Sequence, residues 1–385
     1  MPGIHSHRPG LWVPDSLASL GFRNDEHVDG PAHFLLFAAQ RLSVRAALFW
    51  RKLPPACPRV TLPITATDDA PMTHHHLAAS SHHCHWGYFD ATRAPVLAVK
   101  SGDRVTIDTV SGPPAFLPKG AFHVPPELLE IHAANPGYPL GPHILTGPVA
   151  VDGAKPGQVL EVRILDIKLR QDWGYNLIRP LAGTLPDDFP EPRLLNIPLD
   201  LERNVGRLPW GLELPLAPFY GIMAVAPPKS WGRITSIVPR AHGGNLDNKE
   251  LVPGATLFLP IFVDGALFSC GDGHGVQGDG EVCVTAIETA LQGTFELIVR
   301  DDLSFTYPRA ETPSHYITMG MDPDLDQCAV MALRDMIRLI GERTNLSSED
   351  AYTLCSLAAD LRVTQTVNGS KGIHVMLAKS LLHGS

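Results

Sequence analysis

Residues 149–167, VAVDGAKPGQVLEVRILDI, indicate the kind of fold that this chain adopts. The apolar run Val149–Val151 and the longer run Val159–Ile167 are separated by a turn at Pro156-Gly157. Proline and glycine favour a reversal of the chain, and apolar, β-branched residues on both sides favour strands. The stretch therefore predicts two β-strands joined by a tight connection.

Similar short runs recur after residue 90. Pro95–Val99 and Arg104–Thr109 flank a turn at Ser101-Gly102-Asp103, which repeats the order of strand, turn and strand. Further predicted strands are Ile222–Ala226, Leu257–Val263, Val282–Glu288 and Thr294–Val299. We expect the last two to pair around Gln292-Gly293. Short strands with frequent turns are typical of β-sandwich or barrel-like lobes.

After residue 90, helical patterns come only near the C-terminus. Asp324–Arg343 has apolar residues at helical spacing, and Ser347-Ser348-Glu349-Asp350 has the composition of a cap before a second helix over 349–361. The apolar faces of both helices are expected in the core. The predicted fold class is therefore α+β and β-rich, with sandwich or barrel-like lobes and helices segregated near the C-terminus.

The chain has 385 residues, more than one ordinary core holds, so we expect several lobes. Residues 1–71 are rich in Pro, Arg and His and have poor periodicity outside His33–Trp50, which we interpret as an amphipathic helix. We expect them to be either a disordered extension or a segment upstream of a natural start at Met72. We predict a β-rich N-terminal lobe over 72–240 and an α+β lobe over 241–385.

The charge and the cysteines exclude several classes of protein. The formal net charge of −9 argues against nucleic-acid binding and against an anionic membrane surface. Without a run of 18 apolar residues, no spanning helix is predicted. The six cysteines are scattered without a CxxC pair, which favours reduced thiols and a cytoplasmic location.

The densest polar cluster is Gly271–Glu281, GDGHGVQGDGE. Its glycines allow a tight backbone that brings several side chains to one point. Asp272, His274 and Glu281 offer the oxygen and nitrogen donors that suit Zn²⁺ or a harder divalent ion. A solvated Gly-Asp loop and a structural Ca²⁺ loop are the alternatives for this stretch. The sequence has no nucleophile elbow, P-loop or HExxH motif.

Two further clusters carry candidate residues. In residues 242–247, HGGNLD, Gly244 permits close approach of the backbone, and Asn245 and Asp247 are able to bind a metal or an amide. A turn whose Asn and Asp bond their own backbone is the alternative. The second cluster places six histidines within 74–85, and His85 precedes a strand-forming stretch that leads toward a core or a site.

These motifs resemble those of the acetamidase/formamidase family. The family pattern GGN-x-D stands at 243–247, a variant of LPV with GALF at 259–268, and GD-x-H-A-x-QGDGEV at 271–282. This chain departs from the pattern at Gly275, where alanine is common, and at Ile261, which ends the proline triplet. The resemblance covers about residues 80–385 and leaves residues 1–71 outside it.

The resemblance implies hydrolysis of a short amide to a carboxylate and ammonia, a divalent metal (zinc, with Ca²⁺ or another ion as alternatives) and a homo-oligomer. We assign His274, Asp272 and His85 as metal ligands, and Glu281 as the general base. The remaining assignments are Asp247 as an orienting residue or further ligand, Asn245 as an oxyanion donor, and Gln277, Gly244 and Asn245 as substrate-binding residues.

Two other functions stay open. The first is hydrolysis of a different amide, namely a cyclic, urea-like or larger one. The second is a non-catalytic, metal-stabilised binding module. The pairing of His274 with Glu281 favours catalysis over a structural Ca²⁺ site, because Ca²⁺ takes oxygen donors and has little use for imidazole.

Overall fold

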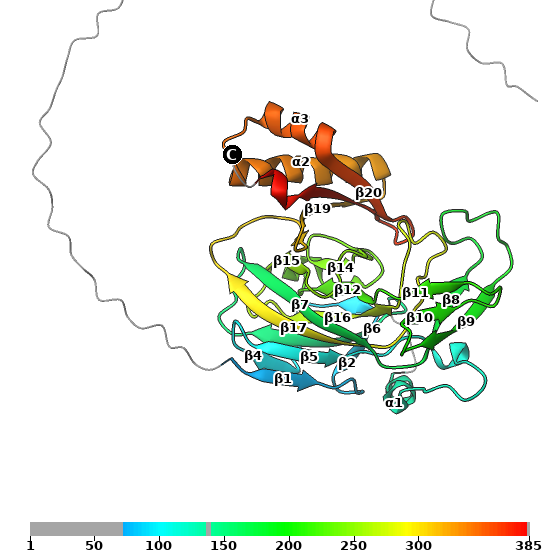
Figure 1. Ribbon diagram of the computed structural model, residues 1–385. Coiled ribbons are helices and arrows are strands. Elements are labelled where there is room, and N and C mark those ends of the chain that lie inside the picture. Colours follow the sequence, from blue (N-terminus) through cyan, green and yellow to red (C-terminus); the bar gives the residue numbers. More distant parts are fainter. Residues whose placement is uncertain (1–71, 136–139, 383–385) are drawn as a thin grey trace, which may run out of the picture. The chain divides into compact units, whose positions relative to one another are not determined.

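The computed structural model describes residues 72–135 and 140–382 (Figure 1). The predicted extension 1–71 lies outside the described residues. No helix in the described part of the chain has both the length and the apolar character that crossing a membrane requires.

The larger sheet has nine strands that the chain visits out of sequence order (Figure 1). In spatial order they are β1 (His74–Leu77), β5 (Arg104–Asp108), β17 (Leu291–Arg300), β7 (Val159–Leu169), β15 (Thr256–Pro260), β18 (Arg309–Glu311), β19 (His315–Asp322), β21 (Lys371–Ala378) and β20 (Ala359–Gln365). The long antiparallel pair β7–β17 runs through its middle. The predicted strand over 159–167 is thus confirmed as part of β7.

The second sheet has six strands and carries the glycine-rich motif. Its path is β14 (Gly243–Asn245), β12 (Phe219–Ala224), β16 (Phe268–His274), β6 (Ile144–Val151) and β2 (Cys84–Trp86), with β4 (Leu97–Val99) paired to β6. Both large sheets take strands from before and after residue 240. The boundary between the two predicted lobes stays a prediction.

The main core lies between these two sheets. Phe295 of the larger sheet contacts Tyr220 and Phe268 of the second sheet, with ring centroids 5.5 and 5.6 Å apart. Val105, Val162 and many other aliphatic residues of both sheets are fully buried around these rings. Burial of such side chains contributes about 1.5–3 kcal/mol each, so the sandwich is a firm support for the residues at its edge.

Smaller elements cover the sandwich. A four-stranded sheet has the order β11 (Glu213–Pro215), β10 (Val205–Arg207), β9 (Arg193–Asp200) and β8 (Trp173–Ile178), and β13 (Ile234–Thr235) pairs with β3 (Tyr88–Phe89). The short 3₁₀ helices are η1 (Pro114–Phe116), η2 (Lys229–Trp231) and η3 (Lys379–Leu381).

The helices lie at the two ends of the described part. α2 (Leu325–Arg343) and α3 (Ser348–Ala358) lie at one end with β19 and β20, and α1 (Pro126–Ala134) lies at the other (Figure 1). Asp324 and Ser347 cap the backbone N–H groups of Asp326 and Asp350, at 2.9 and 3.0 Å. The β-rich α+β fold with C-terminal helices is confirmed, although the second predicted helix ends at Ala358, where β20 begins.

One predicted strand is wrong. Residues 282–288 form turns and bends, and Gln292-Gly293 lies within β17 instead of in a turn. Glu288 makes backbone bridges to both His274 and Tyr175, so the chain folds back over β16. Val282 is exposed as a result. The apolar composition favoured a strand, but the return of Glu288 to His274 determines the local structure.

Candidate metal centre

The first half of the glycine-rich motif is an extended strand. Gly271 to His274 end β16, which pairs with β12 on one side and, through Gly271, with β6 on the other. A Cβ on Gly271 would collide with the carbonyl oxygen of Ile144, and one on Gly273 would lie 2.5 Å from that of Thr289. These glycines therefore permit close approach of neighbouring backbones. The expected tight turn begins only after His274.

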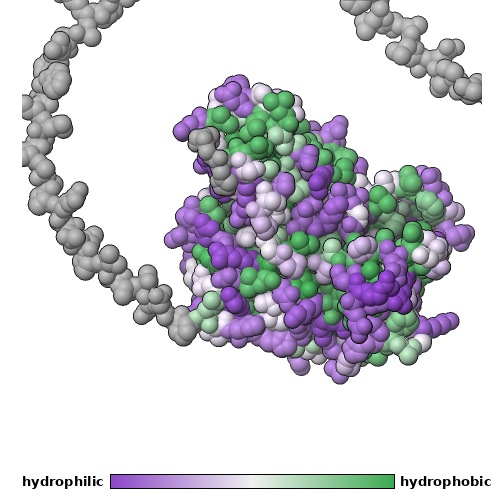
Figure 2. Space-filling model, in the orientation of Figure 1, coloured by the Kyte–Doolittle hydropathy of each residue, from purple (hydrophilic) through white to green (hydrophobic). Residues whose placement is uncertain are grey.

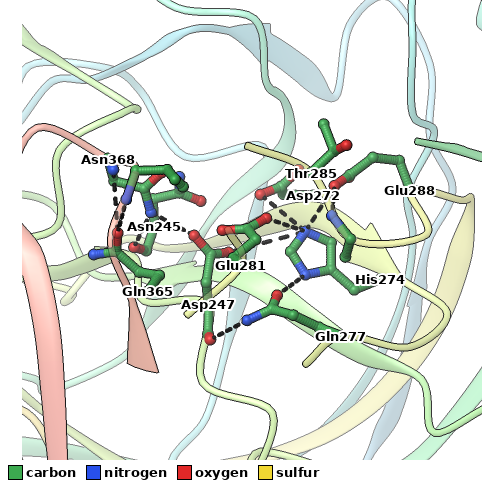
Figure 3. Close-up of polar contacts among 12 residues, drawn as sticks. Asn245, Asp247, Asp272, His274, Gln277, Glu281, Thr285, Glu288, Gln365 and Asn368 are labelled. Carbon is green, nitrogen blue, oxygen red and sulfur yellow. Dashed lines mark hydrogen bonds and ion pairs between the residues drawn. The ribbon is translucent and has the colours of Figure 1, made fainter. Parts of the chain in front are cut away.

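Four carboxylates surround one imidazole nitrogen (Figure 3). The distances from His274 Nε2 are 3.3 Å to Glu288 Oε1, 3.5 Å to Asp272 Oδ2, 3.9 Å to Asp247 Oδ1 and 4.0 Å to Glu281 Oε1. Two groups of donor atoms lie close enough to share an ion, Asp247–Asp272–His274 and His274–Glu281–Glu288. Asp247, which follows β14, thus converges on one point with two residues of β16 and two of the returning 281–288 segment.

The ring of His274 is held by Gln277. Gln277 Nε2 donates to the backbone oxygen of Asp247 at 2.8 Å, which turns Gln277 Oε1 toward His274 Nδ1 at 2.9 Å. Oε1 is an acceptor, so Nδ1 carries the proton in this arrangement. In the neutral ring, Nε2 then presents its lone pair to the carboxylates. This is the tautomer of a metal-ligating histidine whose other nitrogen is bonded outside the metal shell.

The acids of the cluster have no lysine or arginine partner among the described residues. No lysine or arginine forms an ion pair with Asp247, Asp272, Glu281 or Glu288 in the described part of the chain, and Lys249 pairs with Asp279 at 3.0 Å. His274 Nε2, Asp247 Oδ1 and Glu281 Oε2 are buried and have no hydrogen-bond partner. Buried polar atoms are normally bonded, and buried charges are normally paired or coordinate a metal. The donor set fits a divalent cation.

Burial dominates the pKa values of these acids. It raises the pKa of Asp247 to about 6 and that of Glu288 to about 7, although the charge of His274 opposes both shifts. Burial and the charge of Asp247 hold the pKa of Glu281 well above its usual value. Burial also acts to raise the pKa of Asp272, but the charges of His143 and His274 bring it below the usual range. Burial acts to lower the pKa of His274. The charges of Glu288 and Asp272 outweigh it and raise this pKa well above its ordinary value.

A second layer of amides orders Asp247. Asn368 donates from Nδ2 to Asp247 Oδ2 and also to the backbone oxygen of Asn245, at 3.3 Å. Gln365 Oε1 accepts from the backbone N–H of Asn368 at 3.1 Å (Figure 3). The C-terminal strand β20 and its loop therefore fix an acid that lies more than 100 residues earlier in the sequence.

Three acids of the centre have a left-handed backbone. The φ angles are 47° at Asp247, 56° at Asp272 and 43° at Glu281. Non-glycine residues rarely adopt this region, and such strain concentrates at functional sites. Gly221 of β12 leaves room for them, because a Cβ there would lie 2.5 Å from Asp247 Oδ1 and 2.8 Å from Asp272 Oδ2. The backbone is thus shaped around the carboxylates.

The structure brings together most of the residues singled out in the sequence. Asp247, Asp272, His274 and Glu281 form the cluster, and Gln277 and Asn245 adjoin it. Gly244 lies in β14 opposite Met223. His85 belongs to neither donor group. It is buried on β2 with its ring centroid 5.3 Å from that of Tyr88, and burial lowers its pKa to about 3.

Three residues of the site were not identified in the sequence. Glu288 ended a predicted strand, so its return to the cluster was not expected. His143, whose Nε2 lies 4.0 Å from Asp272 Oδ2, stands in GPHILTGPV without a local metal signal. Asn368 reaches the cluster only through tertiary contacts.

A cavity of about 600 Å³ opens onto the centre. Asp272, Glu281 and Glu288 contribute to its wall together with His143 and Asn245. The rest of the lining is mixed. Its apolar residues include Val110, Phe116, Ile144, Tyr175 and Leu177, and its polar residues include Ser111, Arg179, Thr285, Thr366 and Asn368. The carboxylates are therefore accessible to a small molecule from one side.

Several known proteins are similar to this chain in sequence. A sequence model of the Acetamidase/Formamidase family matches residues 140–234 and 230–377. A formamidase from Methylophilus methylotrophus is 30% identical over 200 residues, which are 38% of this chain and 49% of that protein. An acetamidase from Mycolicibacterium smegmatis is 26% identical over 198 residues, which are 36% of this chain and 49% of that protein. The chain spans about half the length of the curated relatives it matches.

The fold also matches a solved structure. The crystal structure of an acetamidase from Bacillus halodurans superposes with a TM-score of 0.69 and 32% sequence identity. The match covers 80% of this chain and 98% of that one.

Proposed function

Because the chain belongs to the acetamidase/formamidase family, we propose that it hydrolyses a short-chain amide, formamide or acetamide, with the help of a divalent metal ion. The products are the carboxylate and ammonia. The observation that carries the metal part of the proposal is the group of four buried carboxylates whose oxygens lie 3.3 to 4.0 Å from His274 Nε2. Among the described residues none of them pairs with a lysine or arginine, and Asp247 Oδ1 and Glu281 Oε2 have no hydrogen-bond partner. Zinc is the preferred ion, because the donors are one imidazole and several carboxylates.

Asp247, Asp272 and His274 are the residues proposed to hold the ion, because their donor atoms form one compact group. Gln277 orients His274, and Asn368 orients Asp247. A bound divalent ion would polarise the amide carbonyl and lower the pKa of a water molecule to about 7. His85, the third ligand expected from the sequence, is not included, since it contacts Tyr88 and not the cluster.

Glu281 is the proposed general base. Its Oε2 is buried without a hydrogen-bond partner, and its side chain lines the cavity beside the donor group. A carboxylate in this place accepts a proton from the attacking water and returns it to the leaving amine. Glu288 differs, because its Oε1 accepts from the backbone N–H of Ala286 at 2.9 Å. Glu281 is therefore the freer of the two glutamates.

Asn245 is proposed to bind the amide carbonyl. Its side chain lies in the cavity wall, and its amide group would donate to the oxygen on which negative charge develops. Gln277 and Gly244 were expected to bind substrate as well. Gln277 is instead proposed as a positioning residue, since both ends of its amide are already bonded.

The test is ammonia release from formamide, acetamide and propionamide by purified full-length protein, before chelation, after chelation and after zinc is returned. We expect activity that chelation abolishes and zinc restores. Activity that survives complete removal of metal would contradict the metal part of the proposal. No ammonia from any of the three amides, with zinc bound at one ion per chain, would reject short-chain amide hydrolysis and leave the other amide classes or a binding module.

A cytoplasmic location and a homo-oligomer complete the proposal. All five cysteines among the described residues are free thiols, which supports a reducing compartment. Leu357 on α3 and Leu361 on edge strand β20 are 80% and 46% exposed. Hydrophobic residues also gather on the surface at the helical end of the molecule (Figure 2). Such an area supports association of subunits. Light scattering of the purified protein gives the mass, and a monomer at every concentration would reject the oligomer.

A further inference from the structure

The cavity beside the centre is much larger than formamide or acetamide requires. Its volume is about 600 Å³. Acetamide has four heavy atoms and needs roughly 100 Å³ if each takes about the volume of one water molecule. Cavities of about 300–1,000 Å³ are usual for ligands of drug size. Most of this space would stay unused by the smallest amides.

One part of the cavity wall has the composition of a site for an apolar ring. Phe116 of η1 and Tyr175 of β8 lie together with ring centroids 5.3 Å apart, tilted by 59°. Ile144, Pro113 and Leu177 add aliphatic surface. Aromatic side chains bind rings through tilted or offset contacts as well as through burial of apolar area. The wall therefore offers an apolar ring more contact than it offers a methyl group.

The aromatic wall is connected directly to the acids. Tyr175 and Glu288 exchange two backbone hydrogen bonds, with Tyr175 N–H donating at 2.9 Å and Glu288 N–H donating at 2.8 Å. Gly112 lets the ring of Tyr175 approach, since a Cβ at Gly112 would lie 2.7 Å from Tyr175 Cε1. The position of the ring surface relative to the carboxylates is thus fixed by the fold. A substrate held by the wall would be held in register with the centre.

We propose that the preferred substrates are primary amides whose acyl side carries a neutral, ring-sized apolar group, of which phenylacetamide is a representative. This inference rests on the proposed amide hydrolysis and specifies its substrate class. The amide group lies at the carboxylates, and the ring lies against Phe116 and Tyr175. Water then adds across the C–N bond as in the smaller amides, giving the arylalkanoic acid and ammonia.

The test compares phenylacetamide with acetamide for the zinc-loaded full-length protein and for Phe116→Ala. Phe189→Ala is the control, because Phe189 is exposed and does not contribute to the cavity. We expect kcat/KM to be at least tenfold higher for phenylacetamide than for acetamide. Phe116→Ala should remove about tenfold or more of the phenylacetamide value, as expected for loss of one large apolar contact. It should leave acetamide within about twofold.

A kcat/KM for acetamide equal to or above that for phenylacetamide, with both hydrolysed, would overturn the substrate class and leave amide hydrolysis intact. Calorimetry distinguishes the remaining case, in which neither amide is hydrolysed. Binding of phenylacetamide that exceeds binding of acetamide, and that Phe116→Ala abolishes, would retain the apolar subsite while the hydrolytic proposal fails. Equal binding of phenylacetamide and acetamide, with neither hydrolysed, would reject both the apolar subsite and the hydrolytic proposal. Equal losses for both amides in Phe116→Ala would show that the variant damages the fold, and Leu177→Ala then replaces it under the same criteria.

Discussion

His274 Nδ1 lies 2.9 Å from Oε1 of Gln277, whose own Nε2 donates to the backbone of Asp247. One glutamine side chain therefore fixes the tautomer of the histidine and connects two donors of the proposed metal centre. The contact spans only three residues along the motif, and it explains why a glutamine is needed between His274 and the acids that follow it.

Gln277→Leu should weaken zinc binding by about 10–100-fold, since partners of a ligating histidine have effects of this size. A competition titration with a chromophoric chelator measures the dissociation constant. Gln158→Leu, which changes a glutamine that bonds Lys155 N–H in an exposed turn, is the control. Unchanged zinc affinity in Gln277→Leu would mean that the tautomer of His274 does not depend on this contact.

Asp272→Asn should lose bound zinc, whereas Asp279→Asn should keep it. Both aspartates belong to the same motif, but only Asp272 faces His274 Nε2, at 3.5 Å, while Asp279 pairs with Lys249 near the surface. Zinc per chain, measured by elemental analysis after gel filtration, separates the two variants. Equal zinc content in both would remove Asp272 from the ligand set.

Glu281→Gln should lower kcat by roughly 10²–10⁴ and retain zinc, as expected when a general base is removed and the metal site survives. The amide keeps the shape of the side chain but does not accept a proton from water. Glu213→Gln, at an exposed ion pair with Arg203, serves as the control. Full activity of Glu281→Gln would transfer the role of base to another acid, with Glu288 as the next to test.

Gly221→Ala should abolish zinc binding without unfolding the protein. The new methyl group would lie 2.5 Å from Asp247 Oδ1 and 2.8 Å from both Asp272 Oδ2 and His274 Cε1, so the donors must move apart. Gly278→Ala is the matched control, because a Cβ there meets nothing within 4 Å. Circular dichroism and zinc content are measured on both variants. Normal zinc content in Gly221→Ala would show that the donor group is wider than described.

Acid should destabilise the protein in part through His242. Burial lowers the pKa of this histidine to about 3, and both ring nitrogens lack hydrogen-bond partners. The unfolded chain takes up the proton near pH 6.5, while the folded chain takes it up only near pH 3. The contribution of neutral His242 to the free energy of unfolding is therefore complete above pH 6.5. It is lost as the pH falls from 6.5 to 3, by up to about 1.4 kcal/mol per pH unit.

His242→Phe should flatten this dependence. Urea unfolding between pH 7.5 and 4.5 gives the free energy of unfolding of each variant, and the exposed His82→Phe is the control. The difference between His242→Phe and the parent protein should grow in favour of the variant as the pH falls. A difference that is independent of pH would show that His242 is protonated in the folded protein.

The fold could be predicted from the sequence where local pattern and tertiary structure agree. The run Val159–Ile167 lies within β7, and the two capped helices lie where their spacing and caps placed them. The prediction of secondary structure failed where a tertiary contact overrides the local sequence pattern. Residues 282–288 have the composition of a strand, but Glu288 turns back to His274 and prevents pairing as one.

The candidate site could be predicted to the extent that its residues lie in dense motifs. Asp247, Asp272, His274 and Glu281 stand in two glycine-rich stretches, and the structure brings them to one point. Asn368 and His143 have no local signature, because only tertiary pairing brings them to the site: β6 pairs with β16, and Gln365 forms a bridge with Gly280. Nor did the sequence indicate that Gly271 and Gly273 serve close strand packing instead of a turn.

The most direct test of the metal centre is anomalous diffraction at the zinc edge from crystals of the zinc-loaded protein. We predict one anomalous peak per chain. It should lie within about 2.0–2.2 Å of His274 Nε2 and of carboxylate oxygens from Asp247 and Asp272. A peak only at another site, such as the exposed His74 on β1, or no peak at saturating zinc, would contradict the assignment of this cluster as a metal centre.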